Sequence, residues 1–170
     1  SDYFENIQIV WTPGRHGANS ISFYDLDNDS DLDLIWGDFY QPGLFYLENY
    51  GNNTDPHFVD SLMVADFPGS GMIETAGFNI PIITDFEPDG TGDLVVGVLS
   101  GNYGTDFIHN LIYYNNNGTD AEYDFQLVTM DLLPGLDLIG GSRPVFADLD
   151  GDNDHDLVVG TEFNPDNSLS

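Results

Sequence analysis

Three short acidic segments, each lying between two apolar runs, constrain the fold of this chain more than any other feature of its sequence. The nine-residue segments are DLDNDSDLD at 25–33, DFEPDGTGD at 85–93 and DLDGDNDHD at 148–156. They hold five, four and five carboxylates, so 14 of the 30 acidic residues fall within 27 positions. Each has an acid at its first, third, fifth and ninth positions, and the segments begin 60 and 63 residues apart. The chain therefore contains an internal repeat of about 60 residues.

The apolar runs on either side of each acidic segment have the composition of β-strands. The preceding runs are 21–24 (ISFY), 82–84 (IIT) and 145–147 (VFA), and the following runs are 34–37 (LIWG), 94–97 (LVVG) and 157–160 (LVVG). Short runs of β-branched and aromatic residues bounded by turn formers predict strands. Each acidic segment is therefore predicted to be the turn of a β-hairpin, and the three are named loop 1, loop 2 and loop 3 in chain order.

Two more extended stretches follow each hairpin, so the repeating unit is predicted to contain four strands. The third strands are expected at 43–49 and 111–115, and the fourth at 56–64 and 122–130. No segment shows sustained helical periodicity, and 19 glycines and 9 prolines punctuate the chain. An all-β fold of four-stranded antiparallel blades of about 60 residues is typical of a β-propeller.

A propeller has about four to eight blades, so this chain is predicted to be an arc of a larger one. We expect an outer strand of a preceding blade at 1–10, blades at 12–66 and 72–132, and the start of a further blade at 140–170. The rest of the propeller would come from the full-length chain.

The spacing of the acids predicts a calcium site in each loop. Oxygens from the first, third, fifth, seventh and ninth residues of a tight loop can converge on one point, and Ca²⁺ prefers six to eight hard oxygen ligands. A glycine at the sixth position permits the sharp turn, as Gly90 does in loop 2. Ser30 and Asn153 occupy that position in loops 1 and 3. Because serine tolerates a left-handed backbone poorly, loop 1 is expected to be the weakest candidate.

The overall charge excludes several kinds of partner. The formal net charge is −28, with two Lys or Arg residues and no cysteine. Such a chain cannot neutralise phosphates, so we do not expect nucleic-acid binding. No apolar run approaches the roughly 20 residues of a membrane-spanning helix, so we do not expect membrane insertion. The absence of cysteine removes disulfides and zinc–thiolate sites.

Three other interpretations of the acidic segments compete with calcium binding. An EF-hand needs an acid at position twelve, where the loops have Trp36, Val96 and Val159. A haloacid-dehalogenase-type phosphatase also has Asp-x-Asp after an apolar strand, but it needs a downstream lysine, and this chain has none. Solvated acidic turns that bind nothing remain a further alternative, although a threefold repeat in one register is hard to explain by solubility alone.

The D-x-[DE]-x-D-x-x-x-D loop, the Asp-Leu-Val-Val-Gly that follows it and the Pro-Val-Phe-Ala before loop 3 resemble the FG-GAP/VCBS repeat family, the integrin-α-type calcium-binding propellers. The resemblance implies up to three Ca²⁺ ions in an extracellular or cell-surface protein. The implied ligands are Asp25, Asp27, Asp29, Asp31 by its carbonyl and Asp33; Asp85, Glu87, Asp89, Thr91 by its carbonyl and Asp93; and Asp148, Asp150, Asp152, Asp154 by its carbonyl and Asp156.

No catalytic residue is predicted outside the loops. His16, His57, His109 and His155 lack metal-ligand spacing, although His16 lies in a glycine-rich connection that could face a binding surface. The aromatic pairs 39–40, 45–46 and 113–114 are expected to pack in the core, with exposed sugar-stacking platforms as the alternative.

Two functions are left open. The first is a non-enzymatic, calcium-binding scaffold that binds an extracellular protein or glycan. The second is a fragment of a carbohydrate-active propeller enzyme, similar to a polysaccharide lyase, with its active site partly outside this chain.

Overall fold

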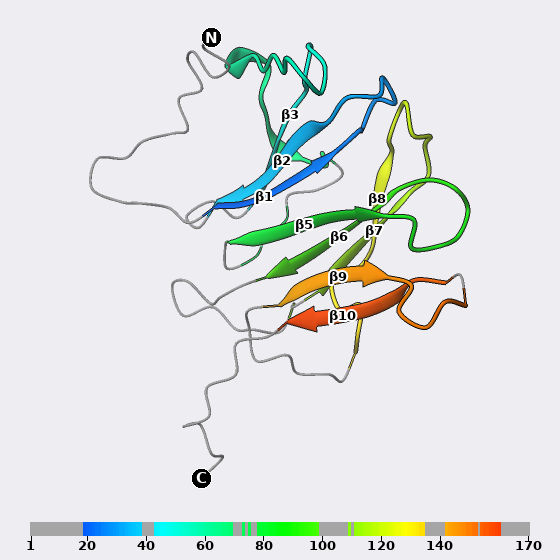
Figure 1. Cartoon of the computed structure of the whole chain (residues 1–170). Helices are drawn as coiled ribbons and strands as arrows, with labels where there is room; N and C mark the ends of the chain where they lie inside the picture. The colour runs from blue at the N-terminus through cyan, green and yellow to red at the C-terminus, as the bar shows by residue number, and fades with distance from the viewer. Residues whose placement is uncertain are drawn as a thin grey trace.

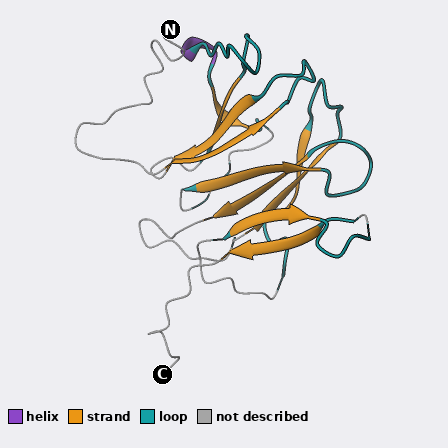
Figure 2. Ribbon diagram, in the orientation of Figure 1, coloured by secondary structure: helices purple, strands orange, loops and turns teal. Residues whose placement is uncertain are grey.

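The computed structural model describes residues 19–38, 43–69, 73, 75, 78–98, 109, 111–134, 142–152 and 154–160. Within these residues the protein is all-β, with ten strands and one short 3₁₀ helix (Figure 2). No helix among them is long and apolar enough to cross a membrane. The predicted all-β class is therefore confirmed. The strand expected at 1–10, His16 and the pair 39–40 lie outside the described residues.

The strands form three antiparallel sheets in chain order (Figure 1). The first sheet contains β1 (Asn19–Tyr24), β2 (Asp33–Asp38), β3 (Leu44–Leu47) and β4 (Val64–Phe67). The middle sheet contains β5 (Asn79–Thr84), β6 (Asp93–Val98), β7 (Leu111–Asn116) and β8 (Phe125–Thr129). The third sheet contains β9 (Arg143–Ala147) and β10 (Asp156–Gly160). The predicted hairpins and four-stranded units are thus present, and each described sheet is open.

The fourth strand of the first sheet was predicted wrongly. It was expected at 56–64, but β4 is Val64–Phe67. Within residues 56–63, Phe58 makes an isolated β-bridge to Asn49, and Asp60–Leu62 forms the 3₁₀ helix η1. The apolar residues at 58–64 suggested a strand, but the buried anchor of this strand is Phe67. In the middle sheet, β8 lies within the predicted range 122–130.

The three sheets stack face to face. Side chains of the first and middle sheets share one core cluster, which includes Ile35, Leu44, Tyr46, Leu94, Val96 and Ile112. Side chains on the other face of the middle sheet pack against the third sheet in a second cluster, which includes Val95, Leu111, Tyr113, Phe146, Leu157 and Val159. Because the middle sheet is covered on both faces, every residue of β6 is buried.

Two glycines allow neighbouring sheets to approach closely. A Cβ atom at Gly37 of β2 would overlap the carbonyl oxygen of Asn79 in β5. A Cβ atom at Gly97 of β6 would overlap the carbonyl oxygen of Ser142, just before β9. Main-chain hydrogen bonds join the same places, from Phe78 N to the carbonyl of Asp38 (3.0 Å) and from Ser142 N to that of Val98 (3.2 Å). The sheets therefore touch backbone to backbone near their first two strands.

Large rings fill the space between the first and middle sheets farther from these contacts. Tyr46, Phe67, Tyr123 and Phe125 come from β3, β4 and the β8 region, and their neighbouring centroids lie 5.3–6.0 Å apart. Edge-to-face and offset contacts at this distance are favourable. Small residues at one end of the interface and rings at the other make it wedge-shaped.

We predict that Gly97→Ala destabilises the protein by about 1–3 kcal/mol, because the new methyl group has no room beside Ser142 and the Pro144 ring, whose Cδ lies 2.6 Å from the ideal Cβ position. Gly160 occupies the same place in β10, where the nearest atoms are 3.8 Å away. Gly160→Ala should therefore stay within about 0.5 kcal/mol of the wild type. Urea unfolding of both variants measures the difference, and equal losses would contradict the close packing at Gly97.

Candidate metal-binding loops

Loops 1, 2 and 3 are the turns between the first two strands of each sheet. The pairs Tyr24–Asp33, Thr84–Asp93 and Ala147–Asp156 close the three hairpins. The hairpin turns lie at the same edge of the stack (Figure 1). All the sequence-predicted ligands are therefore placed in equivalent turns along one edge.

Main-chain N–H groups hold the first and fifth carboxylates of loops 1 and 2 in the same way. In loop 1, Asp25 accepts hydrogen bonds from the N–H groups of Asp29 (3.1 Å) and Ser30 (2.9 Å). In loop 2, Asp85 accepts them from Asp89 (3.2 Å) and Gly90 (3.1 Å). The fifth residue in each loop accepts one from the seventh: Asp29 from Asp31, Asp89 from Thr91 and Asp152 from Asp154. These bonds curl each loop around its own carboxylates.

The ninth carboxylate is a structural clamp in loops 1 and 2. Asp33 is 1% exposed and accepts hydrogen bonds from Leu26 N (3.0 Å) and Asn49 N (2.9 Å). Asp93 is equally buried and accepts them from Phe86, Glu87 and Asn116. In loop 3, Asp156 accepts one from Leu149 (2.9 Å). Each carboxylate thus ties the start of its loop to its end, and in the first two sheets also to the end of the third strand.

Asn49 and Asn116 extend the clamps, and sequence reasoning missed both. The side-chain oxygen of Asn49 accepts hydrogen bonds from Gly51 N (3.1 Å) and His57 N (2.7 Å). Asn116 accepts them from the main chain of Gly118 (3.0 Å) and Asp124 (2.9 Å). Both asparagines are buried and both begin an Asn-x-Gly sequence, Asn49 two residues after β3 and Asn116 at the last residue of β7. This recurring tripeptide was the signal that could have revealed them.

Carboxylates converge in loops 1 and 3. Ligand atoms of Asp25, Asp27 and Asp29 lie within 4.8 Å of one another, and so do those of Asp148, Asp150 and Asp156. All residues of loop 2 are described, yet no trio of its carboxylates comes that close. Loop 1 was expected to be the weakest because of Ser30, but Ser30 adopts a φ of 76° beside Asn28 at 59°. The turn forms without glycine.

Loop 2 satisfies its carboxylates with protein donors instead. The Thr91 hydroxyl donates to Asp89 (2.7 Å), and this bond and the Thr91 N–H lower the pKa of Asp89. The Glu87 side chain is exposed, and the main-chain N–H of Glu87 donates a hydrogen bond to the carboxylate of Asp93. Gly90 has the left-handed φ of 91° that was predicted for it. Loop 2 therefore has the expected glycine, but no three of its carboxylates converge.

Negative charge is disfavoured at several carboxyl groups of loops 1 and 3. Burial and the neighbouring Asp29 raise the pKa of Asp27. In loop 3, the charge of Asp152 raises the pKa of Asp154. Burial raises the pKa of Asp33 to about 6, although N–H groups of Asn49 and Leu26 oppose the shift. A raised carboxyl pKa means that negative charge is disfavoured there, and a cation would relieve it.

Neighbouring loops contact each other. The hydroxyl of Tyr24, which precedes loop 1, lies against Gly92 of loop 2, where a Cβ atom would be 2.6 Å from it. Nδ1 of His155 in loop 3 lies 3.2 Å from the carbonyl oxygen of Asp85 in loop 2. The eighth residue of one loop therefore packs against the beginning of the loop before it.

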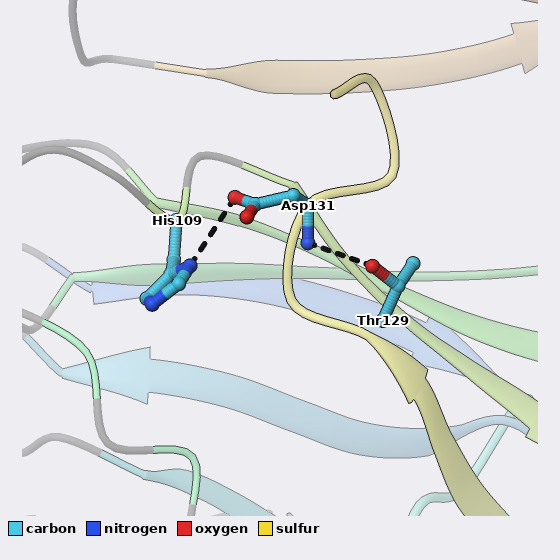
Figure 3. A network of polar contacts seen from close by, with 3 residues as sticks. All are labelled: His109, Thr129 and Asp131. Carbon is cyan, nitrogen blue, oxygen red and sulfur yellow. Dashed lines mark hydrogen bonds and ion pairs between the residues drawn. The ribbon is translucent and has the colours of Figure 1, made fainter. Parts of the chain in front are cut away.

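The histidines do not form a second site among the described residues. His109 pairs with Asp131 through Nδ1 and Oδ1 at 3.2 Å (Figure 3). The Thr129 hydroxyl accepts a hydrogen bond from the Asp131 N–H (3.0 Å) and lies on the far side of Asp131 from the imidazole. The three residues therefore lack the relay from a hydroxyl to the imidazole that nucleophilic catalysis requires.

Core packing is confirmed for three of the four residues in the two described aromatic pairs. Tyr46, Tyr113 and Tyr114 are buried, whereas Phe45 is half-buried and stacks on Trp36 with centroids 5.0 Å apart. Tyr113 and Tyr114 belong to the two core clusters on opposite faces of the middle sheet. The three tyrosines are therefore not exposed platforms for sugar.

No family model, curated protein or solved structure matches this chain. The loops and sheets described above are therefore the basis for assigning a function.

We predict that Asn116→Ala costs about 2–3 kcal/mol of unfolding free energy, because the N–H groups of Gly118 and Asp124 both lose their acceptor. Asn117→Ala is the matched control, since Asn117 is the exposed next residue. Hydrogen exchange at Gly118 and Asp124 should accelerate in the first variant alone. Similar stability and exchange in the two variants would refute the clamp.

The raised pKa of Asp33 predicts a pH dependence of the metal-free protein. Its folded-state pKa of about 6 exceeds the ordinary aspartate value of 3.8, so the folded protein binds more protons than the unfolded chain between these pH values. The stabilisation from this group is fully present below about pH 4 and is lost as the pH rises through about 6, with a slope of up to about 1.4 kcal/mol per pH unit. Urea unfolding in the presence of a chelator should show that the unfolding free energy of Asp33→Asn falls less steeply with rising pH than that of the wild type. The same slope in both proteins would contradict the raised pKa of Asp33.

Proposed function

We propose that the hairpin loops bind Ca²⁺ and that the protein is a calcium-stabilised binding scaffold. The observation that carries this proposal is the convergence of three carboxylates in loop 1 and three in loop 3. Like charges this close repel each other by on the order of a kcal/mol or more per pair. Of the two Lys and Arg residues, Arg143 lies in β9 and Arg15 lies outside the described residues. A bound cation would offset the repulsion.

The donor set favours calcium over other metals. The grouped ligand atoms are all carboxylate oxygens, and neither group includes a histidine. Hard oxygen donors suit Ca²⁺ and Mg²⁺, and flexible loops with many oxygens suit Ca²⁺ better because Mg²⁺ requires a near-ideal octahedron. Bound calcium would supply positive charge that fixes each turn and so stabilises the hairpin.

The residues that would hold the ion differ between loops. In loop 1 they are the grouped Asp25, Asp27 and Asp29, and in loop 3 they are Asp148, Asp150 and Asp156. Loop 2 offers Asp85 and Asp89, but no three of its carboxylates lie within 4.8 Å of one another, and the Thr91 hydroxyl occupies an oxygen of Asp89. We therefore expect loop 2 to bind calcium more weakly than loops 1 and 3.

The sheet packing supports the proposal that the chain is an arc of a β-propeller of the calcium-binding repeat type. Adjacent sheets diverge from the close backbone contacts at Gly37 and Gly97. Between the first two sheets, the rings of Phe67 and Phe125 fill the wider end. If every sheet were inclined to the next in the same direction, the stack would curve into a ring, and further sheets would complete the propeller.

The scaffold would act outside the cell, on a partner protein or glycan. Extracellular calcium modules bind calcium with dissociation constants of about 10⁻⁴–10⁻³ M. Affinities of this kind are expected here because the middle of each loop, at 28–30, 87–90 and 148–152, is exposed to solvent. Contacts between successive loops would make the whole edge rigid when calcium is bound, and a rigid edge can present adjacent loops to a partner at low entropic cost.

Calcium is expected to raise the melting temperature of chelator-treated protein, with affinities in the micromolar to millimolar range. At a calcium concentration of about 100 times the Kd, each filled site adds about 2.7 kcal/mol. Asp148→Asn should remove one binding event in a calorimetric titration and leave the others. The matched control is Asp60→Asn, an exposed acid in η1. The proposal fails if wild-type protein gives no calcium heat, or if both variants lose the same binding.

A further inference from the structure

The first and third sheets lie at the two ends of the stack (Figure 1), and each end exposes apolar side chains. On the face of the third sheet that turns away from the middle sheet, Val145 and Val158 stand opposite each other and are 55% and 45% exposed. On the outer face of the first sheet, Ile21 and Phe23 are 60% and 55% exposed. Val95, which holds the position of Val158 in the middle sheet, is 0% exposed. The ends therefore expose side chains of the kind that the interior of the stack buries.

The two end faces are the two halves of one kind of interface. In both internal interfaces, the face that carries the glycine of the second strand, Gly37 or Gly97, packs on the opposite face of the next sheet. In the third sheet, Gly160 lies two residues after Val158 and so on the same outward face. The first sheet presents the opposite kind of face outwards. Each half of the interface is thus present once more, at opposite ends of the stack.

The register of a further interface of this kind can be counted from the loops. Gly37 lies against the carbonyl of Asn79, and Gly97 lies against that of Ser142. Asn79 and Ser142 both stand six residues before the first aspartate of the following loop, and Asn19 has the same position before loop 1. Gly160 of one copy would therefore meet the main chain of Asn19 in another. Among the described residues, the atom nearest to the ideal Cβ position of Gly160 is Cβ of Arg143, at 3.8 Å, so the approach is open.

The charges at this corner of the two faces are complementary. Arg143 is the strand partner of Gly160, and Asp38 is the strand partner of Asn19. The contact would therefore bring Arg143 of one copy beside Asp38 of the other. A charge pair of this kind favours one orientation and register. Burial of the apolar side chains on both faces would supply the attraction.

We propose that a second copy of this chain docks head to tail on the stack, with the outer face of its third sheet on the outer face of its neighbour's first sheet. The proposal rests on the arc described under the proposed function, since it names a second copy as the source of the further sheets, but it uses no calcium ligand. The contact is heterologous, because it joins two different faces. Repetition of such a contact produces a closed ring or an open stack.

The first test is sedimentation equilibrium of the wild type in chelator. Because the net charge of −28 opposes the contact, the protein is studied in about 0.5 M NaCl, which screens repulsion between copies. The mass should rise from 18.8 kDa in dilute solution to at least twice that value as the protein concentration approaches about 0.5 mM. The mass of one chain at every concentration would overturn the proposal. It would leave the proposed function standing, because that is decided by the heat of calcium binding.

The second test blocks each face in turn. Gly160→Leu has room in the single chain but would fill the place of the Asn19 main chain. Phe23→Asp puts a charge on the other face, and Ile21→Asp does the same if the first variant does not fold. Each variant alone should remain a single chain, whereas an equal mixture of Gly160→Leu with either aspartate variant should form a complex of one copy each. The mixture associates because each variant keeps the face that the other has lost.

The matched control is Leu127→Asp, which changes a side chain of similar exposure in the middle sheet, away from both end faces. This variant should associate as the wild type does. If Gly160→Leu or the folded aspartate variants associate alone, or if the mixture of folded variants does not associate, the head-to-tail contact is refuted. Urea unfolding of each variant in dilute solution establishes that it is folded.

Discussion

Crowding of like charge at the hairpin turns is the constraint on which the rest of the structure depends. The chain has 30 acidic residues against two basic ones, and nearly half of the acids lie in three nine-residue loops. Protein N–H groups satisfy part of this charge, notably at Asp33 and Asp93, which are buried and clamp their loops. Groups of three carboxylates converge in loops 1 and 3. Calcium binding is the proposed remedy for the repulsion within these groups.

The sheets and the loops depend on each other through the clamps. Asp33 and Asp93 join the hairpin turns to Asn49 and Asn116 at the ends of the third strands. The stacked sheets bring successive turns to one edge, where Tyr24 meets Gly92. The same hydrogen bonds therefore hold both the loops and the ends of the third strands in place.

Most of the fold could be predicted from the sequence because apolar runs and acidic turns alternate at a fixed period. The strand at 64–67 could not, since three of its four residues are exposed and its one anchor, Phe67, gives no pattern. The ligand positions were predicted from the spacing of the acids together with the resemblance to calcium-binding propeller repeats, but their convergence depends on the backbone and side-chain conformations of each loop. Ser30 adopts the left-handed conformation, whereas Thr91 in the glycine-containing loop 2 satisfies Asp89. The asparagine clamps were missed because they link segments that only the folded sheet brings together.

The most direct test of the central claim is anomalous X-ray diffraction from crystals grown with calcium. A calcium peak is predicted in loop 1 and another in loop 3, each with carboxylate oxygens of the grouped aspartates at about 2.3–2.6 Å. Loops without a peak, whose aspartate side chains diverge into water, would contradict it.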